Sequence, residues 1–164
     1  MNYVVPELWP DEYPQSNPIA RDLVSKAWLA AGIQKPYLFN LFLWSACCQR
    51  DFIRGLPIQH TSPQALAYKQ ECIRELNKIL SDGTKAITDE VILTIAGLGT
   101  HEILPVIEQN PKPFNSPLQN AGGLRFFGAT NYVKEHMDVL RKLVALRGGL
   151  EYLTLPVLAE ALQM

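Results

Sequence analysis

The sequence predicts an all-α fold, an irregular bundle of about six helices. Two observations support this. Apolar residues recur at spacings of three and four along several segments, as on one face of a helix. Capping residues, prolines and glycines stand at the ends of these segments, where helices begin and end. We divide the chain into a Pro-rich N-terminal arm at residues 1–17 and a helical domain at residues 18–164.

The arm is distinguished by its prolines, which block helix formation and sheet pairing. Large apolar side chains accompany them, and these are Tyr3, Leu8, Trp9 and Tyr13. They suit an extended segment lying along the domain, and a loose tail is the alternative.

The first two helices are expected on either side of Gly32, which is a natural helix stop. Asn17 can cap the first helix, and Pro18 suits its first turn. The second runs from near Pro36 to about Arg54 and is apolar on nearly all sides. Such a helix belongs in the centre of a domain.

The third helix is expected after a cap at Thr61 or Ser62, with Pro63 in its first turn and Asp82-Gly83 at its end. Its apolar residues follow the 3.6-residue period, and charged residues fill the remaining positions.

The fourth helix is expected from Thr88, because Asp89 and Glu90 favour the positive end of the helix dipole. A strand is the alternative over residues 91–95, where β-branched residues cluster. Gly97 and Gly99 weaken this helix by about 1 kcal/mol each relative to alanine, which indicates either close helix contact or a bend.

A Pro- and Gly-rich loop is expected at residues 110–128, as a variable insertion rather than a functional lid. Thr130 or Asn131 should cap the fifth helix, which ends at Arg147-Gly148-Gly149.

A last helix is expected over residues 150–164, restarted or kinked at Pro156. Its apolar residues continue along the whole segment, and they are Leu155, Leu158, Ala159 and Leu162. This predicts an unfinished helix pair or a dimer surface.

Charge and hydropathy exclude two classes of protein. Fifteen basic and sixteen acidic residues give a net charge of -1, which leaves no basic excess for nucleic acid. The longest apolar run, residues 36–48, is shorter than the roughly 20 residues that span a membrane. Three cysteines, an odd count, argue against a disulfide framework and favour an intracellular, reducing compartment.

No metal or cofactor site is expected. His101-Glu102 resembles the start of a zinc-protease helix, but Pro105 stands where the second histidine would be needed. Cys47, Cys48 and Cys72 lie in apolar helix segments, so we interpret them as core residues.

The candidate functional residues are few. The candidates for acid–base catalysis are His60, His101 and His136, and those for ligand binding are Trp44, Asp51, Arg54 and His136. A structural role is the favoured interpretation of His136. Arg147 is expected to favour the helix dipole and to pair with Glu151.

Four segments, in this order, resemble the fungus-specific transcription-factor regulatory domain, the helical region that follows a zinc binuclear cluster in fungal regulators. These segments are residues 36–54, 65–80, 88–104 and 136–153. The most specific is the last, with His136, Leu140, Val144 and the Arg147-Gly148-Gly149 cap. The cysteine cluster of that family is absent, so its DNA binding is not implied here. The chain is then a fragment or, as Met1 slightly favours, a stand-alone relative.

The resemblance implies a helical regulatory or protein-interaction module in the nucleus or cytoplasm. Its expected partners are a second copy or another protein bound through helix faces, and a small apolar ligand. The alternative is a small metal-free enzyme that acts on an apolar metabolite by acid–base chemistry of histidine and carboxylate groups. An exposed apolar face along residues 155–162 would favour the module, and an apolar pocket with converging histidine and carboxylate groups would favour the enzyme.

Overall fold

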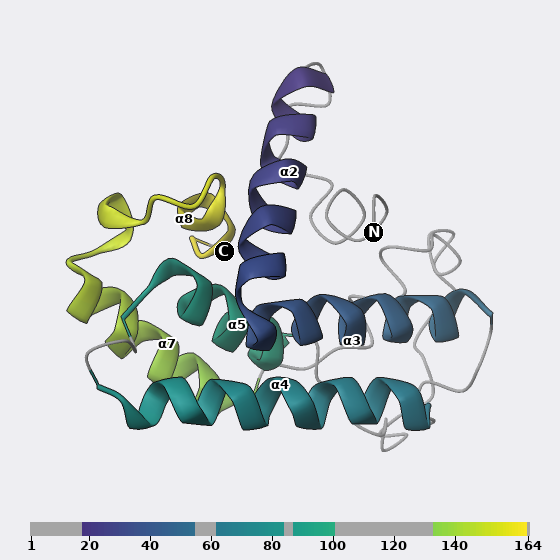
Figure 1. The fold of residues 1–164 in the computed structure, drawn as a ribbon. Coiled ribbons are helices and arrows are strands. Elements are labelled where there is room, and N and C mark those ends of the chain that lie inside the picture. The colour runs from purple at the N-terminus through teal and green to yellow at the C-terminus, as the bar shows by residue number, and fades with distance from the viewer. Residues whose placement is uncertain (1–17, 55–61, 84–86, 101–132, 164) are drawn as a thin grey trace, which may run out of the picture.

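The computed structural model describes residues 18–54, 62–83, 87–100 and 133–163 (Figure 1). These residues form helices and no strand, which confirms the all-α prediction. The elements are α2 (Pro18–Gln34), α3 (Pro36–Ile53), α4 (Pro63–Ser81), α5 (Asp89–Thr100), α7 (Lys134–Arg147), the short 3-10 helix η1 (Leu150–Tyr152) and α8 (Leu158–Ala161). The N-terminal arm and the loop predicted at residues 110–128 lie outside the described residues.

The helices pack mainly as two pairs. Helices α3 and α4 lie side by side and antiparallel, and α5 packs against α7 (Figure 1). Helix α2 stands steeply against the start of α3, and α8 lies beside α2.

Helix α5 forms the centre of the core, because Asp89 and every residue from Val91 to Gly99 are buried. The sequence predicted a central position for α3, which is indeed largely buried but keeps several partly exposed positions. The strand alternative at residues 91–95 is wrong, since tertiary burial on all sides outweighs the β preference of single residues.

The two glycines of α5 allow neighbouring helices to approach closely. A Cβ atom at Gly97 would lie 2.7 Å from Cδ2 of Leu41 in α3, and one at Gly99 would lie 3.0 Å from Cβ of His136 in α7. The close-contact interpretation of these glycines is therefore confirmed.

Local capping explains where α4 and α5 begin. Ser62 caps α4 by accepting a hydrogen bond from the backbone N–H of Ala65 at 3.3 Å, as predicted. Helix α5 begins after Thr88, also as predicted. The predicted cap of α7 at Thr130 or Asn131 is wrong, because the helix begins at Lys134 with Val133 as its cap residue.

A tertiary hydrogen bond helps to fix the start of α7. The backbone N–H of Val133 donates to the carbonyl of Gly99 at 3.0 Å, which ties the first turn of α7 to α5. No side chain caps α7. The start of α7 is therefore not marked by any capping residue in the local sequence.

The Ser62→Ala variant should lower the free energy of unfolding by about 1 kcal/mol, because it leaves a helix N–H without its acceptor. Urea unfolding followed by circular dichroism measures this. Ser81→Ala, at the exposed end of the same helix, is the matched control and should change stability by less. Equal losses in the two variants would argue against the cap.

The Arg-Gly-Gly motif ends α7 as predicted. The N–H of Gly148 donates to the carbonyl of Ala145 at 3.1 Å, and that of Gly149 donates to the carbonyl of Val144 at 3.0 Å. This pair of bonds is a Schellman motif. Both glycines have positive φ, 110° and 119°, a conformation that other residues adopt with strain.

The last helix, predicted over residues 150–164 with a restart or kink at Pro156, is interrupted there and is much shorter than predicted. Only η1 and the four-residue α8 form, because Pro156 lacks an N–H donor and disfavours helical geometry in the residue before it. The dimer surface predicted along this segment stays a prediction, because its apolar residues pack within the same chain in this structure. Leu158 is fully buried, and Leu155 and Leu162 pack against the core of the same chain.

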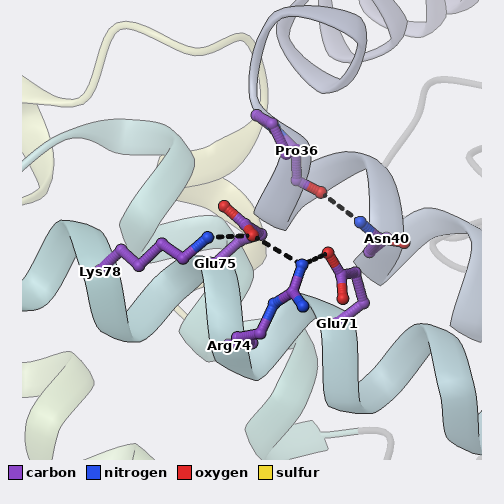
Figure 2. A network of polar contacts seen from close by, with 6 residues as sticks. All are labelled: Pro36, Asn40, Glu71, Arg74, Glu75 and Lys78. Atoms are coloured by element: carbon purple, nitrogen blue, oxygen red, sulfur yellow. Dashed lines mark hydrogen bonds and ion pairs between the residues drawn. The ribbon is translucent and has the colours of Figure 1, made fainter.

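Helix α4 carries a polar network on its surface (Figure 2). Glu75 accepts from Lys78 Nζ at 2.6 Å and from Arg74 Nη2 at 3.2 Å, and Arg74 also pairs with Glu71. Beside this network, Asn40 of α3 donates to the carbonyl of Pro36 at 2.9 Å. Exposed pairs of this kind stabilise a helix by a few tenths of a kcal/mol each.

None of the described helices is both long and apolar enough to span a membrane.

Candidate functional site

The main buried polar cluster joins α5 to the residues after α7. Asp89, in the first turn of α5, accepts four hydrogen bonds from residues far away in the sequence. The donors are Arg147 Nε at 3.1 Å, the Thr154 N–H at 2.5 Å, the Thr154 hydroxyl at 2.9 Å and the Leu155 N–H at 2.8 Å. We call Asp89, Arg147, Thr154 and Leu155 the Asp89 cluster.

Asp89 is ionised in this environment. Burial alone would raise the pKa of its carboxyl group, but the hydrogen bonds from Leu155, Thr154 and Arg147 outweigh burial and hold that pKa below its ordinary value. The side chain of Asp89 is 6% exposed and that of Arg147 is 33% exposed, so the pair is only partly open to solvent. The cluster is therefore a fixed, charged anchor point.

A second anchor holds the same stretch of chain. Trp28 of α2 donates from Nε1 to the carbonyl of Pro156 at 2.8 Å, and its ring is 1% exposed. Leu158 is fully buried two residues later. We call residues 150–163 the strap, because they connect α7 to both α5 and α2 through these contacts.

The pH dependence of stability should report the Asp89 carboxylate. A carboxyl group whose folded pKa is lowered stabilises the fold above its unfolded pKa of about 3.9, and that contribution is lost as the pH falls through the folded pKa. The free energy of unfolding of the wild type should therefore fall more steeply below about pH 4 than that of Asp89→Asn.

Urea unfolding at several pH values measures this difference. Asp51 and Glu75 also have a lowered pKa, so both proteins should lose stability in acid, and the test is the difference between their slopes. Parallel slopes would contradict the role of Asp89.

The ligand-binding candidates at the end of α3 are only partly brought together. Asp51 is buried and accepts from Nε and Nη2 of Arg50 at 2.9 and 2.8 Å. Burial raises the pKa of Asp51, but hydrogen bonds from Ser62 and Arg50 outweigh it and lower the pKa overall. Arg54 is exposed, and Arg50, which was not a candidate, is the side chain bonded to Asp51. These contacts link the end of α3 to the start of α4.

Trp44 is 3% exposed and lies in the core, with Lys69 Nζ 5.2 Å from its ring centroid. This distance fits a cation–π contact between α3 and α4. It gives Trp44 a packing role.

Among the three candidate histidines, only His136 lies within the described residues. It lies on α7 where that helix meets Gly99 of α5. Its Nδ1 is shielded from solvent and has no hydrogen-bond partner among the described residues. His60 and His101 fall outside them.

All three cysteines are buried thiols, as expected of core residues. Burial raises the pKa of Cys72 to about 12, so this thiol stays protonated and unreactive. The described residues also contain no group of histidine, cysteine and acidic side chains that could hold a metal ion.

The sequence missed the Asp89 cluster. Asp89 was interpreted as a helix-dipole residue and Arg147 as a partner of Glu151, and the second interpretation is wrong because Arg147 pairs with Asp89. The signals available were an acidic residue opening an apolar helix and an arginine before the Gly-Gly cap. Neither signal indicates that Asp89 and Arg147 pair with each other, because they are 58 residues apart in the sequence.

Comparison with protein-family models, with curated proteins and with solved structures finds no match to this chain.

Proposed function

We propose that the chain is a helical regulatory and protein-interaction module in the nucleus or cytoplasm. The observation that carries the proposal is a row of exposed apolar side chains on and beside α7. Val139 and Leu146 lie seven residues apart, on one face of the helix, and are 41% and 68% exposed. Tyr152, 59% exposed, packs over Gly148 at the end of the same helix.

We call Val139, Leu146 and Tyr152 the α7 surface. A cluster of exposed apolar side chains is costly in water and typically marks a surface that binds another protein. An aromatic residue in such a cluster adds contact area at low entropic cost, which is why tyrosine is enriched in interfaces. The net charge of -1 opposes association only weakly.

A reporter assay tests the proposal. Fused to a heterologous DNA-binding domain in a yeast reporter strain, the chain should change reporter expression. Leu146→Glu, in the α7 surface, should abolish that effect, because burying a carboxylate in an apolar interface is unfavourable. Leu23→Glu is the matched control, since Leu23 is 62% exposed on α2, outside the α7 surface.

Immunoblots must show equal amounts of the three fusion proteins. A reporter that does not respond to the wild-type fusion, or responds equally to both variants, would contradict the proposal.

The second candidate is a small metal-free enzyme acting on an apolar metabolite, and the shielded Nδ1 of His136 is the observation that favours it. Acid–base catalysis by histidine needs a neighbouring group that orients the ring or exchanges its proton. No described carboxylate is hydrogen-bonded to Nδ1 of His136. We therefore rank the regulatory module first.

A further inference from the structure

The strap depends on the rest of the protein for its conformation. Its two helical pieces have three and four residues, far below the length at which a helix persists by itself in water. Val157 adopts a left-handed conformation with φ of 66°, which is unfavourable for a β-branched residue. Such a residue keeps this conformation only where surrounding contacts impose it.

Two side chains outside the strap, Asp89 and Trp28, supply the polar part of these contacts. Asp89 receives the two successive N–H groups of Thr154 and Leu155, and Trp28 donates to the carbonyl of Pro156. The side chain of Leu158 fills a fully buried position in the core. We call Asp89 and Trp28 the strap site. The strap is thus held by the backbone of residues 154–156 and by the apolar side chain of Leu158.

The strap joins α7 through two glycines in unusual conformations. Gly148 and Gly149 both have positive φ, and glycine populates positive and negative φ about equally. A change of direction between α7 and the strap therefore needs only rotations at these two residues. The large apolar side chains Leu146 and Tyr152 flank this hinge and are mostly exposed.

We propose that the strap also binds the strap site of a second copy of this chain, by rotation at Gly148-Gly149. A second copy has an identical strap site. Each hydrogen bond that the strap makes within its own chain, here called the closed form, can therefore also form between two chains. The exchange would bring two hinges together and cover Leu146 and Tyr152, which the closed form leaves exposed. The inference rests on the proposed function in one respect, because it names a second copy as the partner.

Two variants of the full chain test the exchange by complementation. The strap-defective variant carries Thr154→Val and Leu158→Asp and keeps Asp89 and Trp28. The site-defective variant carries Asp89→Asn and Trp28→Phe and keeps the strap. Each variant by itself lacks one half of the contact, so each should be monomeric in sedimentation velocity. Mixed, they should form a one-to-one dimer, with the intact strap of one in the intact site of the other.

We expect the dimer fraction of the mixture to exceed that of either variant alone by about tenfold, since only the mixture contains both intact halves. Native mass spectrometry of the two chains, made distinguishable by an isotope label, identifies the mixed species. A mixture that stays monomeric while both variants keep their helical circular dichroism would overturn the proposal. If either double variant is unfolded, the single variants Thr154→Val and Asp89→Asn are mixed in the same way and judged by the same outcomes.

The outcomes separate this inference from the proposed function. Failure to complement, together with a reporter effect that depends on Leu146, removes strap exchange and leaves the interaction module. Complementation without any reporter effect removes the regulatory role and leaves strap exchange.

Discussion

Replacing Asp89 with alanine (Asp89→Ala) should lower the free energy of unfolding by about 3 kcal/mol, the size expected when one partner of a buried ion pair is removed. The variant leaves Arg147 without its carboxylate and the N–H groups of Thr154 and Leu155 without their acceptor. Because Arg147 is one-third exposed and can regain water, we expect the lower end of the range for such pairs. Urea unfolding at neutral pH measures the change.

Asp138→Ala is the matched control for this prediction. Asp138 pairs with Arg141 at 2.9 Å on the surface of α7, where both side chains are about half or more exposed. Removing it should cost less than about 1 kcal/mol, as for other exposed pairs. Equal effects in the two variants would show that the Asp89 cluster does not hold the strap.

The Trp28→Ala variant should lower the free energy of unfolding by about 3–5 kcal/mol, the range for deleting a large buried aromatic side chain. Trp28 is 1% exposed and is among the largest fully buried side chains of the described residues. Its loss leaves a cavity beneath the strap and removes the hydrogen bond to Pro156. The same unfolding experiment measures it, and Leu23→Ala, on the exposed side of α2, should have little effect.

Trp28→Phe separates the two contributions. It keeps much of the aromatic volume but loses the indole N–H, so it should cost roughly 1–3 kcal/mol. A loss as large as that of the alanine variant would mean that the hydrogen bond, and not packing, provides most of the stability. No loss in either variant would contradict the burial of this side chain.

The parts of the fold that sequence predicts correctly depend on neighbours within one or two helix turns. Ser62 caps α4 through a residue three positions away, and the Gly148-Gly149 bonds reach back no further than Val144. Such interactions can be predicted from the sequence, because both partners lie within a few residues of each other. The beginning of α7 could not be found in this way, since Val133 is tied to Gly99.

The candidate site needed the tertiary structure for the same reason. Asp89 and Thr154 are 65 residues apart, and Trp28 and Pro156 are 128 residues apart. The apolar pattern at Leu155, Leu158 and Leu162 was visible in the sequence, but a pattern does not say whether its partner is the same chain or another. The described structure places these residues against the core of their own chain.

The contact between Trp28 and Pro156 also bears on how the protein is synthesised. During translation α2 leaves the ribosome long before residue 156 exists, so Trp28 lacks its hydrogen bond to Pro156 while most of the described helices are being made. Contacts between residues so distant in sequence also form slowly, because the intervening chain must first be ordered. The contact of α2 with the strap is therefore among the last of the described contacts that synthesis of the chain allows to form.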